Sequence, residues 1–112
     1  MSPKNNTESQ TRPPTSSELQ ERARSGGAGD IDFLMNLLVK NPNFLLSKLV
    51  DSALGQVETT EGRARIRHYL FNGVNQIQRN YAALYFKRRG ISQVLDEAVA
   101  HGCIDDTQAY AR

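Results

Sequence analysis

Seven cationic side chains and no carboxylates lie between residues 63 and 89 of this 112-residue chain. The cations of this basic segment are Arg63, Arg65, Arg67, Arg79, Lys87, Arg88 and Arg89. Arg and Lys neutralise phosphates and release counterions from nucleic acid, and the interspersed Asn72 and Gln76 can hydrogen-bond phosphates or base edges. Aromatic residues occur throughout the same stretch and offer surfaces on which bases can stack. The segment therefore has the composition of a nucleic-acid interface.

The net charge of +2 hides an uneven distribution of charge along the chain. Residues 31–62 carry four carboxylates against two lysines, and residues 91–112 carry four against one arginine. A cationic stretch needs an external anion, an acidic partner within the chain, or solvent. The carboxylates suited to internal pairing are Glu58, Glu61, Asp96, Glu97, Asp105 and Asp106. We favour nucleic acid as the anion and keep an acidic protein surface and internal pairing as alternatives.

The sequence offers no set of residues suited to catalysis or metal binding. A zinc site needs four ligands, whereas Cys103 is the one cysteine and His68 and His101 are the two histidines. Asp105 and Asp106 are adjacent, so they do not face each other on a helix as a catalytic pair would. We therefore expect a non-enzymatic protein without a metal or a cofactor.

Three features favour a cytoplasmic location. A single cysteine excludes an intrachain disulfide. The N-terminus lacks the apolar region of a secretory signal. No uninterrupted apolar run reaches the length of about 18 residues that a membrane span requires.

The elements that must position these residues are expected to be helices. Residues 1–29 are dominated by Ser, Thr, Pro, Gly and charged residues, with Leu19 as the only large aliphatic side chain after Met1. Such a segment buries too little apolar surface to offset the entropy lost on ordering, so we expect a disordered tail. Within this tail Thr15 or Ser17 can cap about two helical turns. Residues 30–112 are predicted to form an all-α bundle of four to five helices.

The first two helices of that domain, 31–40 and 42–54, form a predicted apolar hairpin. Asp30 and Asn41 are the expected N-caps, and Gly55 is the expected stop. Apolar side chains surround the first helix almost completely, which is typical of a helix buried in a core or against another subunit. We therefore expect a homo-oligomer or a subunit of a larger assembly. The predicted interface consists of Phe33, Leu34, Leu37, Leu38, Phe44 and Leu45.

One long helix, residues 60–89, is expected to carry the basic segment. Its apolar positions recur at spacings of three and four, at Ile66, Leu70, Val74, Ile77, Tyr81 and Leu84. This stripe defines the inner side and places Arg65 and Arg79 on the outer face. Gly73 costs about 1 kcal/mol relative to Ala in a helix interior, which leaves open whether the helix is continuous there. Gly90 is the expected left-handed cap.

Residues 92–112 predict a short helical hairpin, with Ser92 and Asp105 as N-caps and Gly102 as a stop. Ala98 and Gly102 have the spacing of a helix-turn-helix motif, but two aspartates at the start of the reading helix would repel phosphate. Over residues 87–111 the chain resembles one repeat of the RecX family, small helical regulators of the recombinase RecA. The shared positions are Lys87-Arg88-Arg89-Gly90, Val94, Leu95, Gly102, Ile104-Asp105-Asp106 and Tyr110-Ala111. No second repeat follows, and we interpret the stretch as a hairpin that packs on the long helix.

The function that we favour from the sequence is a small nucleic-acid-binding or regulatory protein. It would use the basic outer face of helix 60–89, and DNA and RNA fit that pattern equally well. The alternative is an assembly or adaptor subunit of a larger protein or viral complex. Such a subunit would dock through the apolar hairpin 31–54 and set the basic helix on an acidic partner.

Overall fold

Seven α-helices follow one another along the part of the chain that the computed structural model describes, residues 14–40 and 43–110. They are α2 (Ser16–Ser25), α3 (Ala28–Lys40), α4 (Phe44–Leu54), α5 (Thr60–Asn72), α6 (Gln76–Arg88), α7 (Ser92–Ala100) and α8 (Asp106–Tyr110). No strand occurs among these residues, so the predicted all-α class is confirmed. The predicted count of four to five helices is wrong, because a helix precedes residue 30 and the predicted helix 60–89 is divided in two.

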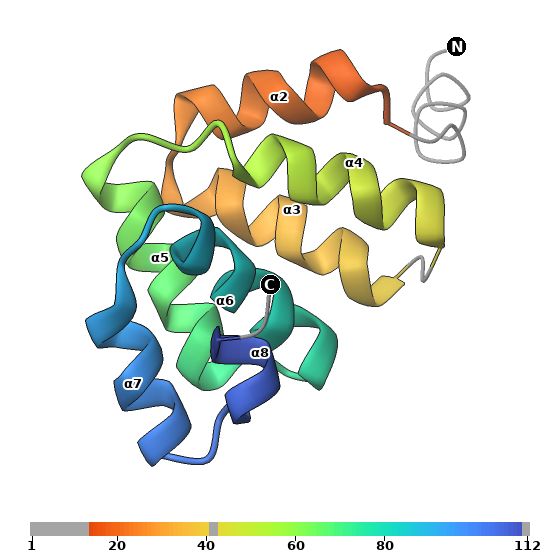
Figure 1. The fold of residues 1–112 in the computed structure, drawn as a ribbon. Helices are drawn as coiled ribbons and strands as arrows, with labels where there is room; N and C mark the ends of the chain where they lie inside the picture. Colours follow the sequence, from red (N-terminus) through yellow and green to blue (C-terminus); the bar gives the residue numbers. More distant parts are fainter. Residues whose placement is uncertain (1–13, 41–42, 111–112) are drawn as a thin grey trace, which may run out of the picture.

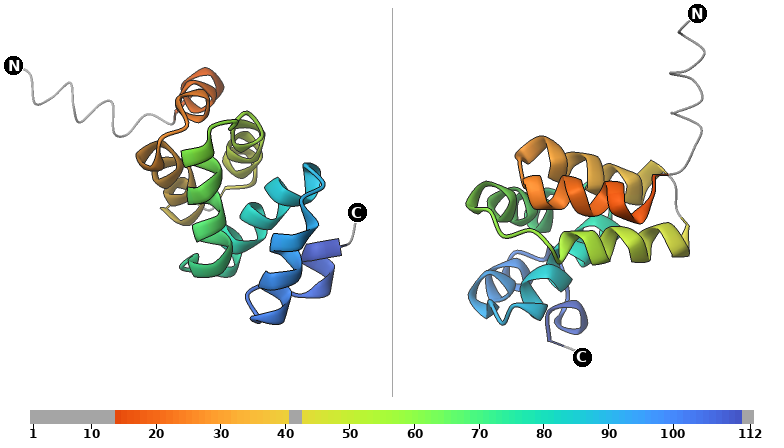
Figure 2. Two further views of the ribbon diagram at one scale, coloured as in Figure 1. Left: turned by 90° about the vertical axis from the view of Figure 1, so that its left-hand side faces the viewer. Right: turned by 90° about the horizontal axis from the view of Figure 1, so that it is seen from above.

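The helices form three groups along the molecule (Figures 1 and 2). At one end α2, α3 and α4 pack against one another, and at the other end α7 packs against α8. Between them, α5 packs on α3 and α6 packs on α7 and α8, while α5 and α6 contact each other. One cluster of buried apolar side chains includes residues of every helix, from Leu19 in α2 to Ala109 in α8. The described residues therefore share a single core.

Helix α2 belongs to this core, so the predicted disordered tail over residues 1–29 is wrong for residues 14–29. A capping box starts the helix: the Thr15 hydroxyl accepts from the Glu18 amide at 3.2 Å, and the Glu18 carboxylate accepts from the Thr15 amide at 2.8 Å. Leu19 and Ala23 lie one turn apart and are fully buried. A short helix of this kind is marginal alone but is stabilised here because α3 and α4 cover its apolar side. The remainder of the predicted tail lies outside the described residues.

Helices α3 and α4 form the predicted apolar hairpin with different starting points. Helix α3 begins at Ala28, and the predicted cap Asp30 instead accepts from the Gly27 amide at 3.0 Å within the first turn. Helix α4 is capped by Asn43, whose side chain accepts from the amide three residues further on at 3.0 Å. The predicted cap Asn41 lies outside the described residues. Helix α3 is surrounded by α2, α4, α5 and α6 of the same chain, which explains why it is apolar almost all round.

Residues 60–89 form two helices and not one, because the chain breaks into α5 and α6 at Gly73 (Figure 1), the position at which the sequence left the continuity of the helix open. The backbone of Gly73 is extended (φ −56°, ψ 142°), and its amide still donates to the Tyr69 carbonyl at 2.9 Å. Asn75 then caps α6 by accepting from the Gln78 amide at 3.1 Å. A Cβ on residue 73 would lie 2.8 Å from the Tyr69 carbonyl oxygen, so the close approach at this break needs glycine.

Gln78 is the one buried polar side chain among the described residues, and it holds the start of α6 against α3. Its amide nitrogen donates to the Met35 carbonyl at 2.9 Å, and its amide oxygen accepts from the Val74 backbone amide at 2.9 Å. Both polar atoms of the side chain are thus satisfied, as the interior of a protein requires. This pair of bonds fixes the direction in which α6 leaves the break.

The predicted C-terminal hairpin is present as α7 and α8. Gly90 (φ 71°) and Gly102 (φ 74°) adopt the left-handed backbone at the two predicted stops. Asp105 caps α8 as predicted, since its carboxylate accepts from the amide three residues further on at 3.0 Å. Ser92 starts α7, but no side-chain hydrogen bond caps that helix. The hairpin packs mainly on α6.

Candidate functional site

The cations of the basic segment, residues 63–89, are divided between two helices that pack against each other. Arg63, Arg65 and Arg67 lie on α5, Arg79, Lys87 and Arg88 lie on α6, and Arg89 is the C-cap of α6. Each of the six arginines has a hydrogen-bonded or ionic partner within the chain. The single outer face expected from one long helix is therefore not formed.

Arg65, which the sequence places on the outer face, joins α5 to α3. Its Nε and Nη2 atoms donate to the two carboxylate oxygens of Asp32 at 2.7 and 3.3 Å, and the Tyr69 hydroxyl donates to the same carboxylate at 2.7 Å. Burial raises the pKa of Asp32, but the hydrogen bonds from Arg65 and Tyr69 outweigh burial and hold that pKa below its ordinary value. Burial and the bond to Asp32 raise the pKa of Tyr69 to about 12. The charge of Arg65 is thus neutralised inside the fold.

Arg79, the second residue expected on the outer face, ties three segments together. Its Nε donates to the Cys103 carbonyl at 3.0 Å, its Nη1 to the Gly73 carbonyl at 2.8 Å and its Nη2 to the Gln76 side chain at 2.9 Å. The Gln76 amide also donates to the Cys103 carbonyl at 3.3 Å. Both predicted phosphate ligands, Arg79 and Gln76, therefore bridge the break after α5 to the loop after α7.

Arg89 closes the end of α6 on the loop that follows α4. Its Nη2 donates to the carbonyls of Gly55 and Val57, both at 2.9 Å, and it forms an ion pair with Glu58 at 3.3 Å. Its guanidinium lies over the Tyr85 ring, 4.4 Å from the ring centroid. The Tyr85 hydroxyl donates to the same Val57 carbonyl at 2.8 Å. These contacts make Arg89 a structural residue of the loop.

Arg67 and Arg88 form ion pairs at the surface. Arg67 contacts Glu97 of α7 at 3.0 Å, with both side chains about half exposed. Arg88 contacts Asp51 of α4 at 2.8 Å, and the Asp51 side chain is only 17% exposed. Exposed pairs contribute little stability, so a partner could recruit Arg67 at low cost to the fold. Recruitment of Arg88 would leave the mostly buried Asp51 carboxylate without its ion-pair partner.

The other predicted ligands are also placed by the structure. Arg63 donates through Nε to the Tyr85 hydroxyl at 3.3 Å and lies 3.8 Å from Glu58. Asn72 is exposed, and its amide donates to a backbone carbonyl of its own helix at 3.2 Å. Lys87 is half-buried.

Internal pairing, one of the three interpretations of the sequence, describes the six arginines. Glu58 and Glu97 were among the carboxylates expected to pair, whereas Asp32 and Asp51 were not. The signal for Asp32 was present in the sequence, because apolar residues lie directly before and after it and dominate the rest of its helix. A carboxylate in such a position needs a cation from another element.

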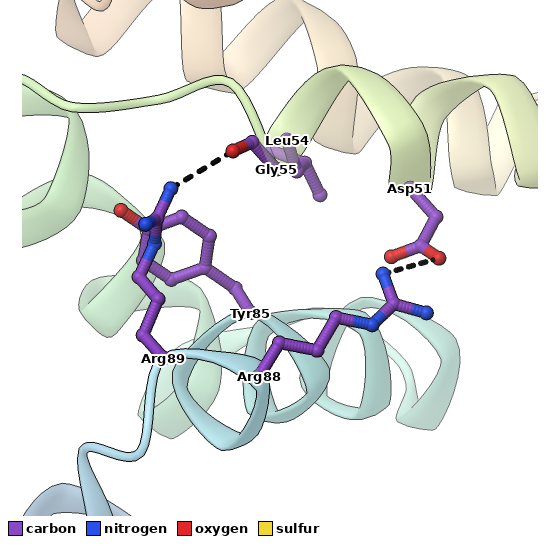
Figure 3. A pocket seen from close by; sticks show the side chains of 6 residues that line it. All are labelled: Asp51, Leu54, Gly55, Tyr85, Arg88 and Arg89. Carbon is purple, nitrogen blue, oxygen red and sulfur yellow. Dashed lines mark hydrogen bonds and ion pairs between the residues drawn. The ribbon is translucent and has the colours of Figure 1, made fainter.

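A cavity of about 170 Å³ lies between the ends of α4 and α6 (Figure 3). It is lined by Asp51, Leu54, Gly55, Tyr85, Arg88 and Arg89. Figure 3 shows the Arg88–Asp51 pair on one side and Arg89 beside Tyr85 on the other. The buried Nε of Arg89 has no hydrogen-bond partner among the described residues. Both guanidinium groups are nevertheless engaged through their terminal nitrogens, so the walls carry little uncompensated charge.

Among the described residues no group of three or more His, Cys, Asp or Glu side chains is placed to hold a metal ion. The Cys103 thiol faces the Phe71 carbonyl at 3.7 Å, and His101 Nδ1 lies 2.8 Å from the Glu97 carbonyl. Within the described ranges, no helix has both the length and the apolar character needed to cross a bilayer.

The six residues predicted to form an oligomer interface fall into two groups. Leu34, Leu37 and Leu38 are buried in the core of the chain itself, and Phe33 is half-buried with the Arg22 guanidinium 4.3 Å from its ring centroid. The three buried leucines cannot meet a second subunit without opening the core, whereas Phe33 is partly accessible. The other two, Phe44 and Leu45, are 79% and 67% exposed.

Phe44 and Leu45 form an exposed surface with Val39, which is 38% exposed at the end of α3. We call these three residues the apolar tip. Sequence reasoning assigned Phe44 to an apolar hairpin, but helical spacing puts it on the same face as Lys48 and Asp51, away from the core positions. The core face of α4 instead carries Leu46, Leu49, Val50, Ala53 and Leu54.

No family model, no curated protein and no solved structure matches this chain. The resemblance of residues 87–111 to a RecX repeat therefore gains no support from a family match.

Proposed function

We propose that this protein is a non-enzymatic interaction module that docks on a partner protein through the apolar tip. The observation that carries the proposal is the exposure of Phe44 and Leu45, 79% and 67%, at consecutive positions in the first turn of α4. Burying a large apolar side chain is worth about 1.5–3 kcal/mol. Aromatic side chains are also enriched among the residues that dominate binding energies. The proposed role is the assembly or adaptor alternative that the apolar segment 31–54 suggested.

The nucleic-acid hypothesis for residues 63–89 stays a prediction, and the geometry favours it less. A phosphate that recruited Arg65 would have to displace the Asp32 carboxylate, and one that recruited Arg79 would have to displace three acceptors. Both displacements would detach α5 or α6 from its neighbour. Arg67 and Arg88 are more accessible, but their carboxylate partners Glu97 and Asp51 would then face the phosphate.

Site-specific photo-crosslinking tests the proposal. A p-benzoylphenylalanine is introduced in place of Leu45, which keeps an apolar side chain at the tip and leaves Phe44 intact. The matched control carries the same group in place of Gln93, an exposed residue of α7 at the other end of the molecule. In cells of the source organism we expect a discrete protein adduct from position 45 and none from position 93. Equal adduct patterns from both positions, or no adduct at all, would contradict docking through the tip.

Fluorescence anisotropy distinguishes the nucleic-acid alternative. Labelled duplex and single-stranded oligonucleotides are titrated with the protein at low and at physiological salt. Binding through six or seven cations would weaken by orders of magnitude over this range. We expect no such binding, and steeply salt-dependent binding that Arg67→Glu with Arg88→Glu abolishes would favour the nucleic-acid function.

A further inference from the structure

The apolar tip projects from the molecule and is not a groove. Phe44 and Leu45 expose 79% and 67% of their surface, and Val39 adds a partly exposed side chain from the adjoining α3. Projecting apolar side chains are complementary to a concave surface on the partner. Binding energy in such contacts is concentrated in a few anchors that enter desolvated pockets. The shape of the tip therefore specifies a pocket on the other protein.

Two lysines accompany the tip. Lys40 follows Val39 at the end of α3, and the Lys48 ammonium lies 5.4 Å from the centroid of the Phe44 ring. Both lysines are exposed, and neither forms an ion pair with any carboxylate of the described residues. The tip thus combines apolar anchors with positive charges that no carboxylate of the described residues neutralises.

The carboxylates of the same two helices are all engaged elsewhere. Those of α3 and α4 pair with arginines of α2, α5 and α6: Asp30 with Arg22, Asp32 with Arg65, and Asp51 with Arg88. Helix α2, which packs on α4, adds two exposed glutamates. One of them, Glu18, accepts from the Thr15 amide at the start of that helix. The charge that α3 and α4 leave uncompensated is therefore positive.

From these observations we infer the chemistry of the partner: an apolar pocket rimmed by Asp and Glu side chains on a different protein. This inference rests on the proposed docking function. The pocket accepts Phe44 and Leu45, and the acidic rim meets Lys40 and Lys48. Complementary charges around an interface speed the association of two proteins and favour the correct partner over others. We assign this role to the two exposed lysines.

A second copy of this chain fits the tip poorly. In a two-fold symmetric contact the same patch meets itself, so the lysines of one protomer would approach those of the other. Like charges set against each other at an interface oppose association. An anionic membrane also fits less well, because helices that lie in a membrane surface bury a long apolar face and carry many cations. Here the apolar face of α4 is already used in the core.

The experiment repeats the crosslinking from position 45 in two further backgrounds. In one, Lys40→Glu and Lys48→Glu reverse both charges; in the other, Lys40→Arg and Lys48→Arg retain them. All four changes are at exposed positions, so circular dichroism is expected to show unchanged helix content. We expect the adduct yield to fall by about tenfold or more in the glutamate background and to persist in the arginine background. Mass spectrometry of the adduct is expected to place Asp or Glu beside the crosslinked peptide of the partner.

The outcomes separate this inference from the function on which it rests. Absence of an adduct in every background would overturn the docking function and the inference together. An undiminished adduct in the glutamate background would overturn the acidic pocket but leave docking in place. An adduct that proves to be a second copy of the chain or a lipid would overturn both the acidic pocket and docking on a different protein.

Discussion

An arginine that meets two oxygens of a half-buried carboxylate differs from an arginine in an exposed pair. Arg65 and Arg67 are two residues apart on α5 and look alike in the sequence. Arg65 shares Asp32 with the Tyr69 hydroxyl, with both members of the ion pair 35% exposed. The Arg67–Glu97 pair is 54% and 48% exposed. Solvent competes with the second pair and much less with the first.

The two arginines are therefore expected to respond differently to the same substitution. Arg65→Met leaves a half-buried carboxylate without its main donor and should lower the free energy of unfolding by about 1–3 kcal/mol. Arg67→Met should change it by less than about 1 kcal/mol. Urea denaturation of both variants checks this difference. Equal losses would mean that the Arg65–Asp32 contact is no stronger than a surface pair.

The raised pKa of Tyr69 gives a second prediction for the same cluster. Its pKa of about 12 in the folded chain lies above the ordinary value of 10.0, so folding favours the protonated phenol. Stability from this group is complete below about pH 10 and is lost as the pH rises from about 10 to about 12. Denaturant midpoints measured across this range should fall more steeply for the native chain than for Tyr69→Phe. Parallel curves would show that the phenol proton is not held by the Asp32 cluster.

At the scale of elements, the decisive event is the break between α5 and α6. A continuous helix would have kept the apolar stripe and the basic face that the spacing predicts. The extended backbone at Gly73 and the Asn75 cap redirect the chain, and the satisfied Gln78 side chain anchors the new helix to α3. Arg79 then crosses the break and bonds the Gly73 carbonyl. Arg79 and Gln76, which the sequence predicts as nucleic-acid ligands, therefore form polar contacts between the segments on either side of α6.

Substitution of Gly73 by Ala distinguishes the break from a continuous helix, because the two arrangements predict changes in folding stability of opposite sign. In a helix interior, Gly73→Ala would stabilise by about 1 kcal/mol. At the observed break it should destabilise, because the new Cβ would lie 2.8 Å from a backbone oxygen and 3.0 Å from the Gln78 side chain. Gly29→Ala is the matched control, since nothing lies within 4 Å of its Cβ on α3. The midpoint temperature of thermal unfolding should fall for Gly73→Ala and should remain unchanged or rise for Gly29→Ala.

At the scale of the whole molecule, the chain covers its own apolar helix and leaves only a small apolar surface. Helix α3 contacts four other helices, so no second subunit is needed to bury it. The large exposed apolar side chains among the described residues are Val39, Phe44, Leu45, Val74, Ile77 and Tyr110. Of these, Phe44 and Leu45 adjoin in the first turn of one helix, which suits a docking contact more than a permanent oligomer.

We therefore expect the isolated protein to be monomeric at micromolar concentration. Light scattering coupled to size exclusion checks its mass directly. Phe44→Ser with Leu45→Ser should leave both the mass and the stability almost unchanged, because the two side chains are mostly exposed. A dimer that this double substitution dissociates would favour self-association and contradict an acidic partner.

The sequence by itself determined the helical class and most helix ends. Periodicity at three and four residues, the caps Thr15 and Asp105, and the glycines at 90 and 102 act over a few residues, so local chemistry suffices to specify them. The sequence analysis placed helix α2 in a disordered tail, because its few apolar residues bury too little surface for a helix alone in water. The helix is stable here because α3 and α4 cover its apolar side.

Only the tertiary structure decided what the charged and apolar residues do. Arg65 and Asp32 are 33 residues apart and meet because α3 packs on α5. The direction of each arginine depends on the break at Gly73, and the exposure of Phe44 depends on which side of α4 the other helices cover. Pairing over such separations depends on three-dimensional packing, and helical spacing alone does not encode which charge will find a partner. The basic segment was therefore visible in the sequence, whereas its neutralisation and the apolar tip emerged only from the fold.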